Sequence, residues 1–173
     1  MVGIPQVVDE KIKWLSGQVD VEFPTEPSLK GRSIYLASIK QCRYSEIVPD
    51  PASDAYTDEA LTNTYLVDFH RLTVMFALLQ ANQYDGQAEK DAIVEFFTQI
   101  ILSPPCQLYL GFEAGQAVAA AIITRNDSEL LISDIVILPN QLYPSADDFS
   151  RVLMKKVDVS PSGSIRCFIE SGE

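Results

Sequence analysis

The chain has 173 residues, of which 47% are hydrophobic and 21% are charged, a composition typical of one globular domain with a sizeable core. Its 13 basic and 24 acidic residues give a net charge of −11, which excludes general nucleic-acid binding and disfavours an anionic membrane surface. Three cysteines without a CxxC pair, together with the lack of a signal-peptide pattern or a long apolar run, predict a soluble cytoplasmic protein with reduced thiols.

Residues 1–32 are predicted to form an N-terminal extension that contains one short helix. Gly17 is suited to end this helix, whose apolar residues recur at helical spacing: Ile4, Val8, Ile12 and Leu15. Residues 19–32 contain two prolines and are predicted to be a short strand or an extended arm. The stretch SIYLASIKQ (33–41) fits a strand or a helix by periodicity, and we favour a strand that begins a second unit, residues 33–173.

An acidic loop rich in proline follows, and it leads into two predicted helices. Its aspartates lack the alternating spacing and central glycine of a calcium loop: Asp50, Asp54 and Asp58. Thr57 is suited to cap a long helix that runs to Gly86, with apolar residues every three or four positions: Leu61, Tyr65, Phe69, Leu72, Phe76 and Leu79. A second helix, 88–102, is ended by two prolines.

The periodicity changes after these prolines. QLYLGF, AVAAAIITR and ELLISDIVIL are predicted to be three strands joined by two turns, which gives an antiparallel meander. Ser145 and Asp148 form a capping pattern for a further helix, and the strand IRCFIE (165–170) follows it. A strand–helix–strand unit of this kind is expected to join parallel strands by a right-handed crossover. The predicted fold class is therefore α/β, with an α+β mixed sheet.

This order of elements resembles the GNAT superfamily of N-acyltransferases over roughly residues 33 to 170, most specifically in YLGFEAGQAVAAAIITRNDSELLISDIVILP. The resemblance implies the transfer of an acyl group from acetyl-CoA or another acyl-CoA to an amine. In that family the end of the fourth strand bulges and exposes backbone groups to the pantetheine arm. The matching positions here are Ile135, Val136 and Ile137, and the next loop adds Gln141, Tyr143 and Ser145 as candidate cofactor contacts.

The loop NQLYPSADDF departs from the family pattern, which usually has a basic residue and alternating glycines. Glycine lets backbone amides close around a pyrophosphate at a helix N-terminus. Here there is no glycine, Pro144 removes one amide, and Asp147 and Asp148 add negative charge. We therefore expect acetyl-CoA to bind weakly or not at all.

The family fold continues after its fifth strand with a helix and two more strands, whereas this sequence stops at FIESGE. The fold is thus expected to be abbreviated at the C-terminus, and three explanations stay open. The chain is cut at this point, the missing strands come from the N-terminal extension or a partner chain, or the protein is an abbreviated relative of the family.

Two functions stay open: an N-acyltransferase, and a non-catalytic binding or regulatory module that keeps the scaffold. A third and weaker interpretation is that the chain is one half of a larger protein or assembly. The acidic surface suits a small cationic amine, and a protein partner or a homo-oligomer is a further option.

Individual candidate residues give weaker signals. Asp134 could act as a general base with a raised pKa if it is buried, but a solvent-facing position is favoured. His70 is the sole histidine, so no metal site is predicted, and Cys106 has no nearby histidine to activate it. Tyr143 either stacks on a ligand or covers the strand ends, and covering is favoured. Three phenylalanines are predicted to lie in the core: Phe69, Phe76 and Phe97.

Overall fold

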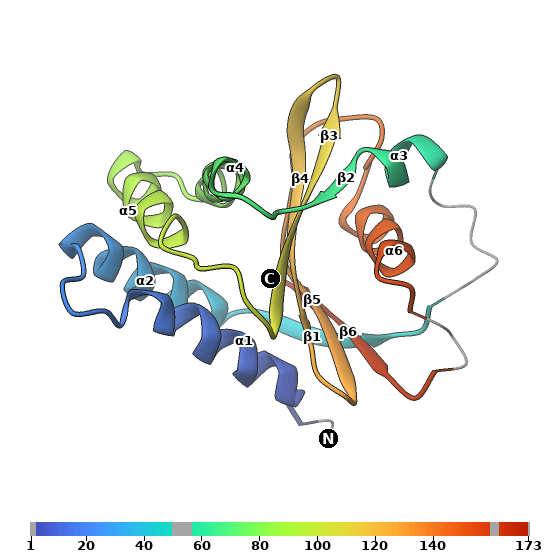
Figure 1. Ribbon diagram of the computed structural model, residues 1–173, viewed down its shortest axis with the longest axis horizontal. Coiled ribbons are helices and arrows are strands. Elements are labelled where there is room, and N and C mark those ends of the chain that lie inside the picture. The colour runs from blue at the N-terminus through green and yellow to red at the C-terminus, as the bar shows by residue number, and fades with distance from the viewer. Residues whose placement is uncertain (1–2, 50–56, 160–162, 173) are drawn as a thin grey trace.

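The computed structural model describes residues 3–49, 57–159 and 163–172, and a six-stranded sheet lies at its centre (Figure 1). The strands in spatial order are β1 (Arg43–Ile47), β6 (Arg166–Ser171), β5 (Glu129–Ile137), β4 (Gln116–Arg125), β3 (Cys106–Glu113) and β2 (Thr64–Leu66). β5 and β6 are parallel, and every other neighbouring pair is antiparallel. The predicted mixed α+β sheet, with a central β5 parallel to β6, is confirmed.

Helices cover both faces of this sheet (Figure 1). One face carries α1 (Gln6–Ser16), α2 (Glu26–Ile39), α4 (His70–Ala81) and α5 (Gln87–Phe97), and the other carries α3 (Asp58–Thr62) and α6 (Ala146–Lys156). A short 3-10 turn, Gly17–Val19, follows α1. The larger core contains Phe76, Phe96 and Phe97 beneath α2, α4 and α5, while Tyr143 and Phe149 lie in the core beneath α6.

Several predicted elements are confirmed by the structure. The N-terminal helix ends at Gly17, and β3, β4 and β5 form the predicted meander. The capping pattern before α6 is also present: the backbone N–H of Asp148 donates to Ser145 Oγ at 3.2 Å, and Ser145 Oγ donates to Asp148 Oδ2 at 2.8 Å. Phe76 and Phe97 are buried in the core as predicted.

The predicted strand at residues 33–41 is wrong, because most of this stretch belongs to α2. Thr25 caps α2 by accepting a hydrogen bond from the backbone N–H of Ser28 at 3.2 Å. Pro27 lies in the first turn, where a helix needs no amide hydrogen and tolerates proline. The predicted short strand or extended arm over 19–32 is wrong for residues 26–32, which belong to α2 as well. α2 crosses the predicted domain division at residue 32, and that division stays a prediction.

The predicted long helix from residue 57 to 86 is also wrong. It is divided into α3, β2 and α4, because Thr64–Leu66 pair with Tyr109–Gly111 of β3. Hydrogen bonding to a distant strand outweighs the helical spacing of the apolar residues. Phe69 lies at the start of α4 with 53% of its surface exposed, so its predicted core position is wrong.

The strand β1 lies beside β6 and is antiparallel to it, with Arg43 opposite Ser171 and Ile47 opposite Cys167. A strand that comes early in the chain therefore lies at the edge of the sheet beside the C-terminal strand. Asp50 and Asp54 of the predicted solvated loop lie outside the described residues.

Candidate functional site

A cleft opens where the two parallel strands diverge. β5 and β6 pair only as far as Ile132 opposite Ile169, and a cavity of about 640 Å³ lies beyond this point. The end of α4, the C-terminal half of α2 and the first residues of α6 complete its walls. We call this cavity the β5–β6 cleft. Its volume suits a small-molecule ligand.

A bulge in β5 shapes the cleft. Between the pairs Ala120–Val136 and Ile122–Ser133, β5 has one residue more than β4, and Asp134 adopts a left-handed backbone with φ of 54°. The bulge frees the backbone groups of Asp134 from the ladder. Its N–H donates to Glu170 Oε1 at 3.0 Å, and its carbonyl accepts from Gln80 Nε2 at 2.7 Å. The backbone N–H and carbonyl of Asp134 are thus both hydrogen-bonded to side chains of the protein.

The side chain of Asp134 belongs to a buried polar cluster at the base of the cleft. Lys11 of α1 is fully buried, and its Nζ lies 2.9 Å from both Asp134 Oδ2 and Glu170 Oε2. Tyr35 donates to Asp134 Oδ1 at 2.7 Å, and Ser133 donates to Asp134 Oδ2 at 2.7 Å. Tyr44 donates to Glu170 Oε2 at 3.0 Å. We define the polar cluster as Lys11, Tyr35, Tyr44, Gln80, Ser133, Asp134 and Glu170.

The charges of the polar cluster shift its pKa values. Burial alone would lower the pKa of Lys11, but Asp134, Tyr35 and Glu170 outweigh it and hold the pKa of the ammonium well above its ordinary value. Burial and the charge of Asp134 raise the pKa of Glu170, because two carboxylates share one ammonium. Burial and Asp134 also raise the pKa of Tyr35 well above its usual value, so its hydroxyl stays a donor.

The cleft has an acidic lining. Three carboxylates line it, those of Asp134, Asp147 and Glu170, and no lysine or arginine is among the described residues that do. The Lys11 ammonium lies 2.9 Å from two of these carboxylates, those of Asp134 and Glu170. The remaining polar lining consists of hydroxyl, thiol and amide groups: Tyr35, Ser38, Gln41, Cys42, Gln80, Gln83, Tyr84 and Ser171. Burial raises the pKa of Cys42 to about 11, so its thiol is protonated at neutral pH.

The loop between β5 and α6 binds groups of the protein itself. The carboxylate oxygen Oε1 of Glu113, at the β3–β4 turn, accepts from the backbone N–H of Gln141 at 2.9 Å and of Leu142 at 3.1 Å. Asn140 Oδ1 accepts from the N–H of Tyr143 at 2.6 Å. The side chain of Glu113 therefore holds the position in which an anion would contact these amides.

These residues do not fit the pyrophosphate of acyl-CoA. Three consecutive amides, from Gln141 to Tyr143, already donate to side-chain oxygens, and Pro144 has no amide hydrogen. The carboxylates of Glu113, Asp147 and Asp148 would repel a phosphate. Acyl-CoA would have to displace an internal carboxylate and rebuild the loop.

The structure divides the six predicted cofactor positions among different environments. Ile135 lines the β5–β6 cleft, Val136 is buried in the core, and Ile137 is half-buried. In the loop, Gln141 and Ser145 are exposed, whereas Tyr143 is fully buried. Their role in cofactor binding stays a prediction. The favoured solvent-facing position for Asp134 is wrong, because the bulge turns its side chain into the protein.

Of the polar cluster, only Asp134 is among the candidate residues predicted from the sequence, and its two charged partners, Lys11 and Glu170, are not. Lys11 was detectable, since it lies four residues from both Val7 and Leu15 on the buried stripe of α1. Nothing local marked Glu170, because the bulge that brings Asp134 to it is a property of the pairing of β5 with β4.

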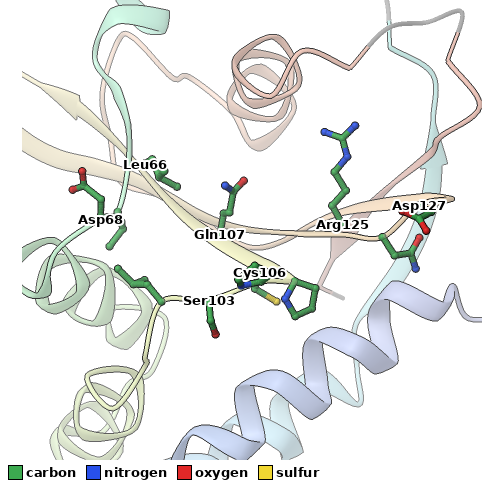
Figure 2. Close-up of a pocket in the computed structure, with 12 residues that line it drawn as sticks. Leu66, Asp68, Ser103, Cys106, Gln107, Arg125 and Asp127 are labelled. Atoms are coloured by element: carbon green, nitrogen blue, oxygen red, sulfur yellow. The ribbon is translucent and has the colours of Figure 1, made fainter.

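A second cavity of about 670 Å³ lies at the other end of the sheet, beside β2 and β3 (Figure 2). Gln107 and Arg125 point to the same side of the sheet, while Cys106 lies in the core on the opposite side. Burial raises the pKa of Cys106 to about 12, which argues against a nucleophilic thiol. We call this cavity the edge groove.

The part of the chain that the structure describes contains no group of three or more histidine, cysteine, aspartate or glutamate side chains that could hold a metal ion. His70 is exposed at the first turn of α4. None of the described helices has the length and apolar character needed to cross a bilayer.

Comparison with known proteins gives limited information. No protein-family model matches the chain, and no curated protein matches it in a sequence search. Among solved structures, it is similar to a protein from Novosphingobium aromaticivorans that is assigned to the GNAT family of acetyltransferases, with 14% identity and a TM-score of 0.41. The match covers 76% of this chain and 55% of that one. The chain thus spans about half the length of that structure.

Proposed function

We propose that this chain is a non-catalytic binding domain on a GNAT-like scaffold, which does not hold acyl-CoA and binds a small organic cation in the β5–β6 cleft. The observation that carries the first part is the carboxylate of Glu113 on the amides of Gln141 and Leu142. A second internal carboxylate, Glu170, holds the N–H that the bulge exposes at Asp134. Loop amides at the position of the expected pyrophosphate, and the N–H of Asp134 beside the predicted positions Ile135, Val136 and Ile137, are thus engaged by the protein.

The ligand class follows from the charge and chemistry of the cleft. Three carboxylates and several hydroxyl and amide oxygens line it, while the single ammonium of Lys11 lies behind two of those carboxylates. A small organic cation gains attraction from this field and can donate hydrogen bonds to its oxygens. A phosphorylated ligand meets repulsion at the same place.

The first experiment is a calorimetric titration of the wild-type protein with acetyl-CoA. We expect no detectable binding, because a ligand must displace Glu113 and meet the charges of Asp147 and Asp148. An active GNAT acetyltransferase serves as the positive control. A Kd in the micromolar range or tighter would contradict the proposal and favour an N-acyltransferase, for which the bulge and the divergence of β5 from β6 provide a cleft at the place that the resemblance implies.

Two sets of variants separate charge from geometry in this loop. If charge is the obstacle, Asp147→Asn and Asp148→Asn should each improve acetyl-CoA binding by about 0.3–1 kcal/mol, the size of a charge effect at a helix terminus. We expect both variants to leave binding undetectable, because Glu113 still occupies the amides. Glu113→Ala combined with glycines at 143–146 tests the geometric alternative, and calorimetry is the readout.

The second experiment tests the ligand class by thermal shift. Putrescine is expected to raise the Tm, whereas the neutral diol of the same chain length and succinate are not, since a ligand of the folded state stabilises it by mass action. Asp147→Asn should weaken putrescine binding about 1.5- to 5-fold, the equivalent of an exposed ion pair. Asp148→Asn removes the same charge one residue away, outside the cleft lining, and is the matched control. Equal shifts with the diamine and the diol would sink the cation assignment.

A further inference from the structure

We propose that the edge groove binds a small zwitterion, a molecule with an ammonium group and a carboxylate group at the two ends of a short apolar chain. The groove has a volume of about 670 Å³, which suits a small-molecule ligand. It lies beside the first residues of β3, which extend past the end of β2. No described residue lines both the edge groove and the β5–β6 cleft, so the two sites are separate.

The walls of the groove are held in place by hydrogen bonds within the protein. Trp14 of α1 donates from Nε1 to Ser103 Oγ at 3.1 Å, which fastens the segment before β3 to the N-terminal helix. On the side of β2, the backbone N–H of Val67 donates to the carbonyl of Leu108 at 2.8 Å. The groove is therefore preformed, and a ligand does not have to order its walls.

The charged side chains that line the groove have no partner of opposite charge, unlike those of the polar cluster. Asp68, Arg125 and Asp127 are all exposed, and none of them forms an ion pair with a described residue. Gln107 accepts from the Tyr109 hydroxyl at 3.5 Å through Oε1, and its Nε2 donates to no described residue. These polar groups are thus available to a ligand.

Arg125 and Gln107 form the end of the groove that suits a carboxylate. Gln107 lies opposite Ile123, two residues before Arg125 on β4, so both side chains leave the same face of the sheet (Figure 2). Diagonal neighbours of this kind are about 7–8 Å apart, a gap that two long side chains span. A guanidinium and an amide N–H₂ both donate to carboxylate oxygens.

Asp68 provides the end of the groove that suits an ammonium. Figure 2 shows Asp68 and Arg125 on opposite sides of Gln107. Asp68 follows β2 and Arg125 ends β4, so two strand spacings, about 10 Å, separate their backbones across the sheet. The side chain of Leu66 is 40% exposed and lines the groove, where it can contact an apolar chain between the two charges.

The signs of the charges select a zwitterion over a simple anion or cation. The lining carries one guanidinium and two carboxylates, because Asp127 follows Arg125 in the turn between β4 and β5. A simple anion gains from Arg125 but is repelled by both carboxylates, and a simple cation leaves Arg125 without a partner. A zwitterion of sufficient length brings an opposite charge to each end of the groove.

An amide-resolved NMR titration with ε-aminocaproate tests the site, because it locates binding and detects weak affinity. We expect chemical-shift changes at the amides of the residues that line the groove. Caproate lacks the ammonium, and glycine is too short to reach both ends, so both should bind more weakly. No shift at the groove, or equal affinity for ε-aminocaproate and caproate, would overturn the proposal.

Variants of exposed residues test the two ends separately. Arg125→Gln should weaken ε-aminocaproate binding at least about 10-fold, the loss of a hydrogen bond to a charged group. Lys30→Gln, which removes the same charge from the exposed side of α2, should leave binding unchanged. Asp68→Asn should weaken binding about 1.5- to 5-fold, whereas Asp127→Asn should not weaken it, because Asp127 lies beside the carboxylate end. Equal losses from the two aspartate variants would refute the assignment of the ends, and circular dichroism confirms that each variant is folded.

Discussion

Replacing Lys11 by methionine is expected to lower the free energy of unfolding by about 3–5 kcal/mol, as found when one partner of a buried ion pair is removed. The Lys11 ammonium is fully buried between Asp134 and Glu170, whose side chains are also almost entirely buried. Methionine fills a similar volume but leaves two carboxylates close together without a cation. Urea denaturation measures the change, and Lys13→Met is the matched control. Lys13 lies on the exposed side of the same helix, so its replacement should change the free energy of unfolding by no more than about 0.5 kcal/mol.

The pH dependence of the Lys11→Met variant gives an independent check. A carboxyl group whose pKa is raised in the folded protein binds a proton more tightly there than in the unfolded chain, so lower pH favours folding. The pKa of Glu170 is already raised in the wild type, and the loss of Lys11 raises it further. The stability that the variant loses at neutral pH should return as the pH falls toward 4.5, the ordinary pKa of a glutamate, which applies to Glu170 in the unfolded chain. Thermal melting from neutral to mildly acidic pH measures this recovery.

The wild-type ammonium has the opposite dependence. The pKa of Lys11 is raised above its ordinary value of 10.5. The contribution of its charge to stability is therefore complete below pH 10.5 and is lost as the pH rises through the pKa of the folded state.

Adding Glu170→Gln to Lys11→Met removes one uncompensated charge and should recover part of the stability. A variant Lys11→Met with wild-type stability at neutral pH would show that the polar cluster is not held together by this ammonium.

The sequence predicts the elements whose signals are local. β3, β4 and β5 are apolar runs between turn residues, and α6 begins with a Ser145–Asp148 cap, so each is recognisable within about ten residues of sequence. The sequence does not predict α2, because Pro24 and Pro27 are typical of an interrupted, extended segment, whereas Pro27 lies in the first turn of the helix, where proline is well suited.

Elements that depend on distant partners could not be predicted in this way. β2 exists because Thr64–Leu66 hydrogen-bond with β3, more than 40 residues later, and nothing within the segment competes with its helical spacing. The bulge at Asp134 likewise depends on the register of β5 against β4. It reverses the direction of one side chain and so decides whether a carboxylate faces solvent or the core.

The candidate site shows the same division. The lack of glycine in the β5–α6 loop is visible in the sequence, and it predicts a poor site for a pyrophosphate. That Glu113 supplies the substitute anion is not visible, because this residue lies 28 positions before Gln141. Of the polar cluster, Asp134 is marked in the sequence as a carboxylate in an apolar strand, and Lys11 as a charged residue in the apolar stripe of α1.

Replacing Tyr143 by alanine is expected to cost about 3–5 kcal/mol of unfolding free energy, the range for the removal of a large buried aromatic side chain. The ring is fully buried and packs edge-on against Phe149, with centroids 5.1 Å apart. It also lies against Gly111 of β3, where an added Cβ would come within 2.7 Å of the ring. Its hydroxyl donates to the carbonyl of Ala60 and lies 3.0 Å from Thr64 Oγ1.

These contacts fasten the loop after β5 to α3 and β2, and they give a physical reason why the loop does not open around a pyrophosphate. Tyr143→Phe keeps the ring and loses the hydroxyl, so it should cost only about 0.5–1.5 kcal/mol, the contribution of a hydrogen bond. Gln141→Ala, in the same loop but exposed, should fall within about 0.5 kcal/mol of the wild type. Urea denaturation distinguishes the three variants. If Tyr143 instead stacks on a ligand, Tyr143→Ala will leave the denaturation midpoint unchanged and alter only ligand binding. That result would contradict the interpretation that side chains of the protein itself fill this loop.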